Sequence, residues 1–448
     1  MAPGGRAGTV RIGGGAGFAG DRLEPAVDLV RHGRLDYLIL ECLGERTIAL
    51  GQLARMRDPR RGYDSLLDRR ARAVLPALVS TGTRLVTNFG SANPLAAGER
   101  LVEIAEELGL AQWVRVAVVT GDDVFERLDT DAAAWEDGLP LAEHGDLVSA
   151  HAYIGSDALL PGLASGATVV VAGRVADPSL CLAPLIYEFG WSLDDWNLLG
   201  KGTAIGHLLE CAGQVTGGYY ADPPRKPVPD LANLGYPIAE IDAAGAATLS
   251  KLPDTGGVLD RHTVTEQLLY EVTDPRAYLT PDVTLDLTDI ELDEGPGVVG
   301  VRGAIGKPRP DTLKVSVGYR AGYRCEAEIS YAGTGAVTRT RLAGQLVQNW
   351  IGDQLEDIRI DVVGVDSIHG DRLADGREPY ESRLRVVALA ASPELAQVAA
   401  DAVTALYTNG PAGGGGVRTR IDELVGILST AMPRSDVELD TVVLGGAG

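Results

Sequence analysis

Short apolar runs alternate with amphipathic segments over about the first 190 residues, and this alternation constrains the fold more than any other feature. Runs such as 35–41 (LDYLILE) and 167–172 (ATVVVA) are mostly apolar, as strands buried on both faces of a parallel sheet must be. The segments between them, such as 65–80, have the spacing of helices that cover a sheet. The predicted strands are 10–14, 35–41, 84–88, 113–119, 147–152 and 167–172.

This pattern predicts an α/β fold with a mainly parallel sheet and flanking helices. An open, Rossmann-like sheet is favoured over a closed barrel, because about six strand–helix units are visible and a barrel needs about eight. Past residue 260 the pattern changes to an α+β type. We therefore predict an α/β domain over 1–260, which carries the active site, and an α+β domain over 261–448. The elements predicted in the second domain are strands at 283–292, 312–319, 324–331, 358–364 and 383–390 and helices at 340–355 and 393–407.

Composition narrows the choice of partner and compartment. The net charge of −22 argues against nucleic acids and anionic membranes, which both need a basic surface. No apolar run reaches the roughly eighteen residues of a membrane span. The four cysteines are far apart and form no C-x-x-C pair, so a disulfide framework or a cysteine-ligated zinc is not expected. We expect a reduced cytoplasmic protein that forms a homo-oligomer and binds a small molecule.

The glycine-rich segment 11–21 (RIGGGAGFAGD) contains a literal G-x-G-x-x-G after a short strand. In a dinucleotide-binding turn the helix begins within this motif. Here the helix signal begins later, with Asp21 as the predicted N-cap and Glu24 three residues on. Gly15, Gly17 and Asp21 are therefore predicted to line a substrate site, and a nicotinamide-binding site or a purely structural glycine turn are the alternatives.

Polar residues follow the predicted strands, where ligands bind in open α/β sheets. Acids, a histidine and an arginine are sufficient for proton transfer beside a carbonyl or anionic group. Asp177 could instead cap a helix, His151 could be a hydrogen-bonded core residue, and Asp122 could cap the next segment. The strand-end residues predicted to be catalytic are Glu41, Asp122, His151, Arg174 and Asp177, and Asn88 is predicted to bind substrate.

The segment 206–218 (GHLLECAGQVTGG) reads as part of a helix over 203–216. His207, Glu210, Cys211 and Gln214 would then share one helical face. Glu210 is predicted to be catalytic, with His207 and Gln214 binding substrate; a solvent-facing polar stripe is the alternative. The two-histidine and paired-cysteine spacings of common metal sites are missing, so no metal is expected.

Near the end of the chain, 409–418 (NGPAGGGGVR) places four glycines before Arg418. Free backbone amides beside an arginine could bind an anion, so Arg418 is predicted to bind substrate. The segment lacks the Gly-Lys-Ser/Thr of a phosphate-binding P-loop. A flexible surface turn is the alternative.

Seven stretches occur in order over nearly the whole chain: IGGGAGFAGD, LDYLILECLGERT, SAHAYIGSDALLPGLASGATVVVAGRVADPSL, IYEFGW, GHLLECAGQVTGGYY, PDTLKVSVGY and NGPAGGGGVR. Together they resemble the acyclic terpene utilisation AtuA family. The resemblance implies an acyl-CoA or related branched acid as substrate. Many relatives continue into a small ferredoxin-like tail, before which this chain is expected to stop. The high Ala, Arg and Gly content resembles relatives in specialised metabolism, and LECLGERT departs from the family's second-strand motif.

These observations lead to a hypothesis of a cofactor-independent lyase or hydratase acting on an α,β-unsaturated or β-hydroxy acyl thioester, with CoA as part of the substrate. Glu41, Asp122 or Asp177 would be the base, His151 or Glu210 the acid, and Arg174 with the glycine amides the clamp on the carbonyl. Two alternatives remain open. One is a non-catalytic accessory subunit of an acyl-CoA-processing complex, and the other is an NAD(P)-dependent oxidoreductase.

Overall fold

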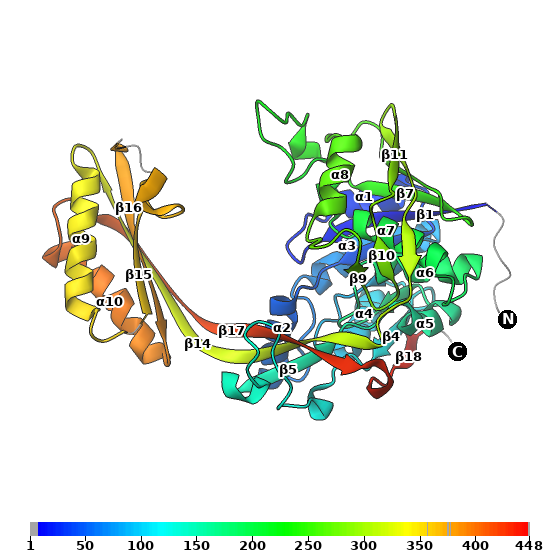
Figure 1. Ribbon diagram of the computed structural model, residues 1–448, viewed down its shortest axis with the longest axis horizontal. Helices are drawn as coiled ribbons and strands as arrows, with labels where there is room; N and C mark the ends of the chain where they lie inside the picture. Colours follow the sequence, from blue (N-terminus) through cyan, green and yellow to red (C-terminus); the bar gives the residue numbers. More distant parts are fainter. Residues whose placement is uncertain (1–7, 356, 374–375, 377, 447–448) are drawn as a thin grey trace. The chain divides into compact units, whose positions relative to one another are not determined.

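The computed structural model describes residues 8–355, 357–373, 376 and 378–446, and its chain forms two compact units (Figure 1). The first unit comprises the chain up to 143, residues 148–318 and the chain from 427 onward. The second comprises 144–147 and 319–426. The boundary expected at residue 260 falls inside the first unit, because strands after that point extend the main sheet.

The first unit is built on a ten-stranded sheet in the order β11-β12-β8-β7-β1-β2-β3-β6-β4-β18. Strands β1, β2, β3, β6 and β4 pair in parallel, and the other strands join antiparallel. The parallel strands are β1 (Thr9–Gly17), β2 (Tyr37–Glu41), β3 (Arg84–Thr87), β4 (Arg115–Thr120) and β6 (Val169–Val171). The antiparallel strands are β7 (Pro237–Asp242), β8 (Ala247–Lys251), β11 (Glu291–Gly295), β12 (Val298–Arg302) and β18 (Asp440–Gly445). This confirms the predicted α/β fold with an open sheet.

One predicted strand of the parallel sheet lies elsewhere. The segment 147–152 does form a strand, β5 (Leu147–Ala152), but it pairs with the long strand β14 (Thr312–Ala332). The apolar side chains of β5 are buried beside β14 as they would be in the parallel sheet. The sequence pattern alone therefore does not indicate which sheet the strand joins. The parallel sheet therefore has five strands instead of six.

Both faces of the parallel strands are buried, as their apolar sequences require. On β2, Leu38 and Leu40 belong to the core beneath α1, α3 and α4, whereas Tyr37 and Ile39 belong to the core beneath α6 and α7. Successive side chains of a strand point to opposite faces, which explains this division. The helices are α1 (Glu24–His32), α2 (Glu45–Arg57), α3 (Leu67–Thr81), α4 (Pro94–Glu107), α5 (Leu160–Ala164), α6 (Ser179–Phe189), α7 (Trp196–Leu209) and α8 (Arg261–Leu269).

A small three-stranded sheet packs against α7 and brings further residues to the site. Its strands are β9 (Tyr278–Leu279), β10 (Thr284–Asp286) and β13 (Ile305–Lys307). The helix predicted over 203–216 ends earlier, since α7 stops at Leu209 and a short 3-10 turn follows at Ala212–Gln214. Gln214 therefore does not share a helical face with His207.

The second unit has a β-α-β-β-α-β order and the sheet order β15-β16-β14-β17, which is the ferredoxin-like arrangement. Its two helices pack over one face of the sheet, where the core lies. The two strands expected at 312–319 and 324–331 are the single strand β14. The other elements are α9 (Ala336–Ile351), β15 (Asp357–Val363), β16 (Glu381–Ala390), α10 (Pro393–Asn409) and β17 (Gly415–Pro433). Within the described residues, every helix is too short or too polar to cross a bilayer.

Candidate active site

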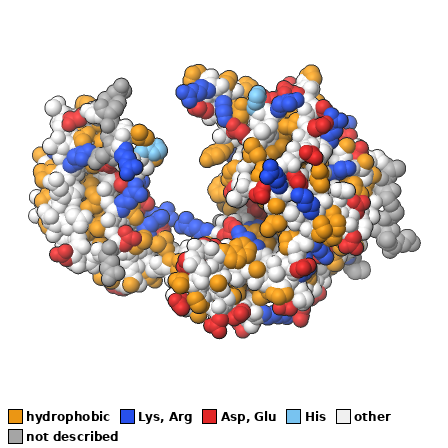
Figure 2. Space-filling model, viewed as in Figure 1, with side chains coloured by type: hydrophobic (Ala, Val, Ile, Leu, Met, Phe, Trp, Pro, Cys, Tyr) orange, Lys and Arg blue, Asp and Glu red, His pale blue; other side chains and the backbone are white. Residues whose placement is uncertain are grey.

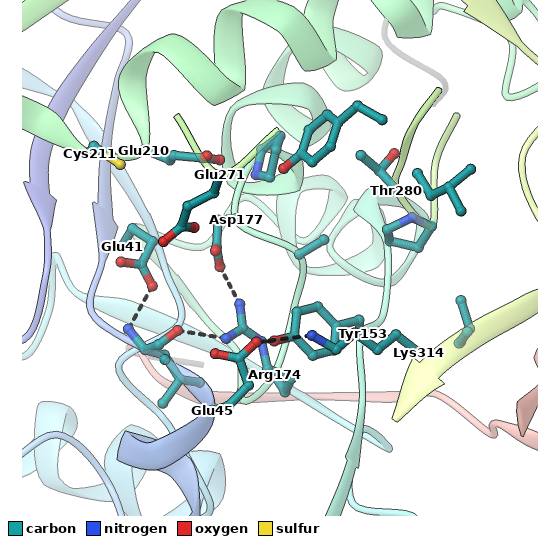
Figure 3. A pocket seen from close by; sticks show the side chains of 18 of the residues that line it. Glu41, Glu45, Tyr153, Arg174, Asp177, Glu210, Cys211, Glu271, Thr280 and Lys314 are labelled. Atoms are coloured by element: carbon teal, nitrogen blue, oxygen red, sulfur yellow. Dashed lines mark hydrogen bonds and ion pairs between the residues drawn. The ribbon is translucent and has the colours of Figure 1, made fainter. Parts of the chain in front are cut away.

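A cavity of about 480 Å³ opens in the first unit at the carboxyl ends of β1, β2 and β6 (Figure 3). The start of α2, the residues after α7, strand β9 and the start of β14 complete its wall. Five of the residues singled out from the sequence line it: Gly17, Glu41, Arg174, Asp177 and Glu210. The position agrees with the expectation that ligands bind beyond the carboxyl ends of parallel strands.

Glu41 is the last residue of β2, and its carboxyl group is buried. Its Oε1 accepts hydrogen bonds from the Leu43 amide at 2.6 Å and from Asn88 Nδ2 at 3.0 Å. Burial raises the pKa of Glu41 well above its usual range, and the charge of Asp177 adds to this effect. Burial therefore favours the protonated form of the Glu41 carboxyl group. Asn88 also accepts from the Cys42 amide at 2.8 Å, so its contacts fix Glu41 and its neighbour in place.

Arg174 lies fully buried in the wall, with 1 % of its side chain exposed. Its Nη1 donates to the Leu43 carbonyl at 2.6 Å, its Nε donates to the Val175 carbonyl at 3.2 Å, and its Nη2 pairs with Asp177. The guanidinium carbon lies 4.3 Å from the centre of the Tyr153 ring. Most of its donors are thus engaged within the protein, which leaves Arg174 as a fixed positive charge beside the cavity. Burial raises the pKa of Asp177 despite this pairing.

Glu45, Tyr153 and Lys314 form a second polar group in the wall (Figure 3). The Tyr153 hydroxyl and Lys314 Nζ both donate to Glu45 Oε1, the latter at 3.1 Å. Burial would raise the pKa of Glu45, but these hydrogen bonds lower it to about 2, so the carboxylate stays charged. The predicted site did not include these three residues. Glu45 and Tyr153 lie just beyond the predicted strands 35–41 and 147–152, within reach of the strand-end rule, whereas Lys314 comes from a distant strand without a motif.

His207 and Glu210 form a buried pair at the end of α7. His207 Nδ1 lies 2.7 Å from Glu210 Oε1. Glu210 Oε2 and His207 Nε2 are buried and have no hydrogen-bond partner among the residues that the structure describes. Burial raises the pKa of Glu210 to about 7, although His207 opposes this rise. Burial is the largest influence on the pKa of His207 and would lower it, but the charge and hydrogen bond of Glu210, together with Leu268 and Glu271, outweigh burial and the net shift is upward.

Asp122 and His151, both predicted to be catalytic, pair with each other but are not part of the cavity lining. Asp122 Oδ2 lies 3.1 Å from His151 Nδ1 and accepts the Arg174 amide at 2.7 Å. Both side chains are buried. The contacts of Asp122 therefore join the end of β4 to the turn after β6, which places Arg174.

The glycine segment is a strand as far as Gly17, where β1 ends, and a turn follows over 18–20. A Cβ on Gly15 would meet Leu38 and Leu40 at 2.8 Å, and a Cβ on Gly17 would lie 2.3 Å from the Cα of Cys211. These glycines allow close packing in the strand. Asp21 does not cap α1 as predicted, since its carboxylate accepts the Gly17 amide at 2.7 Å. The helix begins only at Glu24, so its N-terminus is offset from the G-x-G-x-x-G segment.

The remaining predicted substrate-binding residues are not part of the cavity lining. Gln214 closes the 3-10 turn after α7, and Arg418 lies on β17 in the second unit. His207 reaches the lining through Glu210 and through Tyr278, whose ring centre lies 5.2 Å from that of His207. Over the described ranges, no three His, Cys, Asp or Glu side chains are grouped so that they could hold a metal ion.

The family model described as "Acyclic terpene utilisation family protein AtuA" matches residues 10–443 of the chain. No curated protein and no solved structure matches it.

Proposed function

The chain belongs to the acyclic terpene utilisation family AtuA, and from that premise we propose that it is an enzyme that removes water from a β-hydroxy acyl thioester or adds water to the unsaturated product. The carrying observation is Glu210: its Oε2 is buried at the cavity without a partner in the described part of the chain, and its pKa is raised to about 7. A carboxyl group with that pKa exchanges a proton readily near neutral pH.

Two carboxyl groups in one cavity have different surroundings, which supports separate roles. Glu210, whose pKa is raised to about 7, acts as the base, and Glu41, whose burial favours the protonated form, acts as the acid. His207 holds Glu210 through Oε1 and leaves Oε2 free for substrate.

In the dehydrating direction, Glu210 takes the proton from the carbon next to the thioester carbonyl. The electrons of that C–H bond form the carbon–carbon double bond as the C–O bond of the β-hydroxyl breaks. Glu41 protonates the departing hydroxyl, and water leaves. The reverse sequence hydrates the double bond. The fixed charges of Arg174 and Lys314 line the same cavity and stabilise the negative charge that develops on the carbonyl oxygen.

The charges of the wall favour a neutral thioester over a free acid. The cavity lining contains two cationic side chains, Arg174 and Lys314. It also contains five acidic ones, which are Glu41, Glu45, Asp177, Glu210 and Glu271. Those two already pair with Asp177 and Glu45. A substrate carboxylate would therefore bring a further full negative charge among carboxyl groups whose cationic neighbours are already neutralised, which is costly in a partly desolvated site.

A direct test follows the exchange of the α-proton. The wild-type protein is incubated in heavy water with a branched 3-hydroxyacyl-CoA and with the matching enoyl-CoA, and both hydration and deuterium incorporation are measured. We expect turnover and incorporation in the wild type and loss of both in Glu210→Gln. Equal turnover by the variant, or a wild type that neither converts nor labels either thioester, would overturn the proposal and favour an accessory, non-catalytic role.

A further inference from the structure

Three large apolar side chains at the cavity are unusually exposed to solvent. Phe18 is 63 % exposed, Trp135 is 58 % exposed and Leu279 is 64 % exposed. All three line the cavity. They come from the turn after β1, the loop before β5 and strand β9, so three separate segments place apolar surface at one opening.

Exposure alone does not distinguish these residues, because hydrophobic side chains are scattered among charged ones on the face drawn in Figure 2. What distinguishes them is their convergence on one cavity. Exposed apolar surface that gathers at a pocket is typical of a ligand-binding site.

The backbone beneath Phe18 is fixed by a buried ion pair. Arg70, 1 % exposed on α3, pairs with Asp64 at 3.2 Å and donates through Nη2 to the carbonyls of Phe18 at 3.3 Å and Ala19 at 2.6 Å. The Phe18 ring lies over Gly20, where an added Cβ would come within 2.4 Å of it. The ring thus packs over Gly20 on a backbone that Arg70 holds, although most of its surface is exposed.

Hydrogen bonds also hold the backbone at Trp135 and next to Leu279. The Trp135 amide donates to the Ser429 carbonyl at 2.8 Å, and Glu136 accepts the Ser429 amide at 2.9 Å. Leu279 precedes a turn in which the Thr280 hydroxyl donates to the Val283 carbonyl at 2.8 Å. Holding an apolar surface in place before binding lowers the entropy lost when a ligand covers it.

We propose that Phe18, Trp135 and Leu279 form an apolar rim that binds the distal hydrocarbon part of the substrate and selects for chain length. This rests on the proposed function for the identity of the polar end, which lies deeper among Glu41 and Glu210. A short acyl group stays within the cavity, whereas each further methylene covers part of the rim. Burial of one methylene strengthens binding about fourfold.

The experiment measures dissociation constants by calorimetry for two series of neutral ligands. One series is the butyryl, hexanoyl and octanoyl thioesters of N-acetylcysteamine, and the other is butanol, hexanol and octanol. Binding is compared among wild type, Phe18→Ser, Trp135→Ser and the control Trp113→Ser, whose side chain is 52 % exposed but is not part of the cavity lining. Circular dichroism confirms that each variant is folded.

We expect affinity to rise with chain length in the wild type and in Trp113→Ser. In Phe18→Ser and Trp135→Ser the octyl ligands should bind about tenfold more weakly, while the butyl ligands keep their affinity. The proposal is overturned if the affinity of the wild type does not depend on chain length, or if Phe18→Ser and Trp135→Ser keep that dependence. If the alcohols show the dependence but no thioester binds, the rim stands and the proposed chemistry fails.

Discussion

His207 Nδ1 contacts Glu210 Oε1 at 2.7 Å while the other oxygen of the same carboxyl group remains buried without a partner in the described structure. One oxygen thus orients the side chain, and the other is the atom to which we assign the substrate proton. A buried acceptor without a partner is costly, which supports that assignment.

Replacing Glu210 by Gln should lower kcat for the thioester reaction by about a hundred- to ten-thousandfold, because the amide cannot accept the substrate proton. The dissociation constant for the same thioester should change little, since the shape is kept. In the wild type, kcat for dehydration should fall as the pH drops below about 7, where Glu210 becomes protonated. Steady-state kinetics across pH, with ligand binding measured in parallel, checks this; a flat profile would contradict Glu210 as the base.

The same carboxyl group should make the folded protein less stable as the pH rises. Its pKa rises from 4.5 to about 7 on folding, so the folded state binds the proton more tightly, and the protein loses up to about 3 kcal/mol of stability as the pH rises from about 4.5 to about 7. The raised pKa of His207 acts in the same direction, because its favourable charge is lost as the pH rises. Urea unfolding at pH 5 and pH 8 should show Glu210→Gln gaining stability relative to wild type at the higher pH. A difference that does not change with pH would count against the raised pKa.

Asn88→Ala should reduce both stability and activity, because it removes a buried side chain that binds Glu41 and the Cys42 amide. We expect a loss of about 1–3 kcal/mol in the free energy of unfolding. Asn409→Ala is the control, since Asn409 is exposed and its amide donates only to nearby groups of α10. Chemical denaturation and kcat of the two variants should therefore differ, and matching values would show that Asn88 does not position Glu41.

Arg70→Met should destabilise the protein by about 3–5 kcal/mol, because it leaves Asp64 buried without its partner. Arg100→Met breaks the ion pairs of Arg100 with Asp68 and Glu103 at the surface, and it should lower the free energy of unfolding by only about 0–1 kcal/mol. The double variant Arg70→Met, Asp64→Leu should recover part of the loss. Urea unfolding of the three proteins decides the matter, and equal losses at the two arginines would argue against the buried pair.

Gly17→Ala should also destabilise the chain, by about 1–3 kcal/mol, since the new methyl group would meet the backbone of Cys211 at 2.3 Å. Gly415→Ala is the matched control, because no atom of the described chain lies within 4 Å of its added Cβ. Thermal unfolding of both variants separates close packing from a cofactor role. If NADH raised the melting temperature of wild type by several degrees, the dinucleotide interpretation of this segment would be restored.

The local sequence pattern was sufficient to predict much of the fold. All five parallel strands, β1, β2, β3, β4 and β6, follow from the apolar runs, and α3 follows from the spacing in 65–80, because each of these elements depends on its own sequence. The partner of β5 was not predictable, since pairing with β14 joins residues far apart in the chain. The role of Asp21 was mistaken for the same reason: a local capping pattern was outweighed by a closer donor, the Gly17 amide.

Only part of the cavity lining could be inferred in advance. Glu41, Arg174 and Asp177 follow parallel strands, so the rule for strand ends placed them together. Asp122 satisfies the same rule yet turns to His151, because a buried carboxylate takes the nearest donors available. Lys314 and Leu279 reach the lining from β14 and β9, whose approach depends on tertiary packing that no motif records.

The second unit is reached through β14 and left through β17, and these two strands are neighbours in one sheet. The chain therefore leaves the first unit along one strand and returns to it along the neighbouring strand. A segment with that connectivity can be shortened without changing the order of the strands in the first unit. Residues 319–426 are in this sense an inserted module, and a turn joining the two strands is the simplest way to build the protein without it.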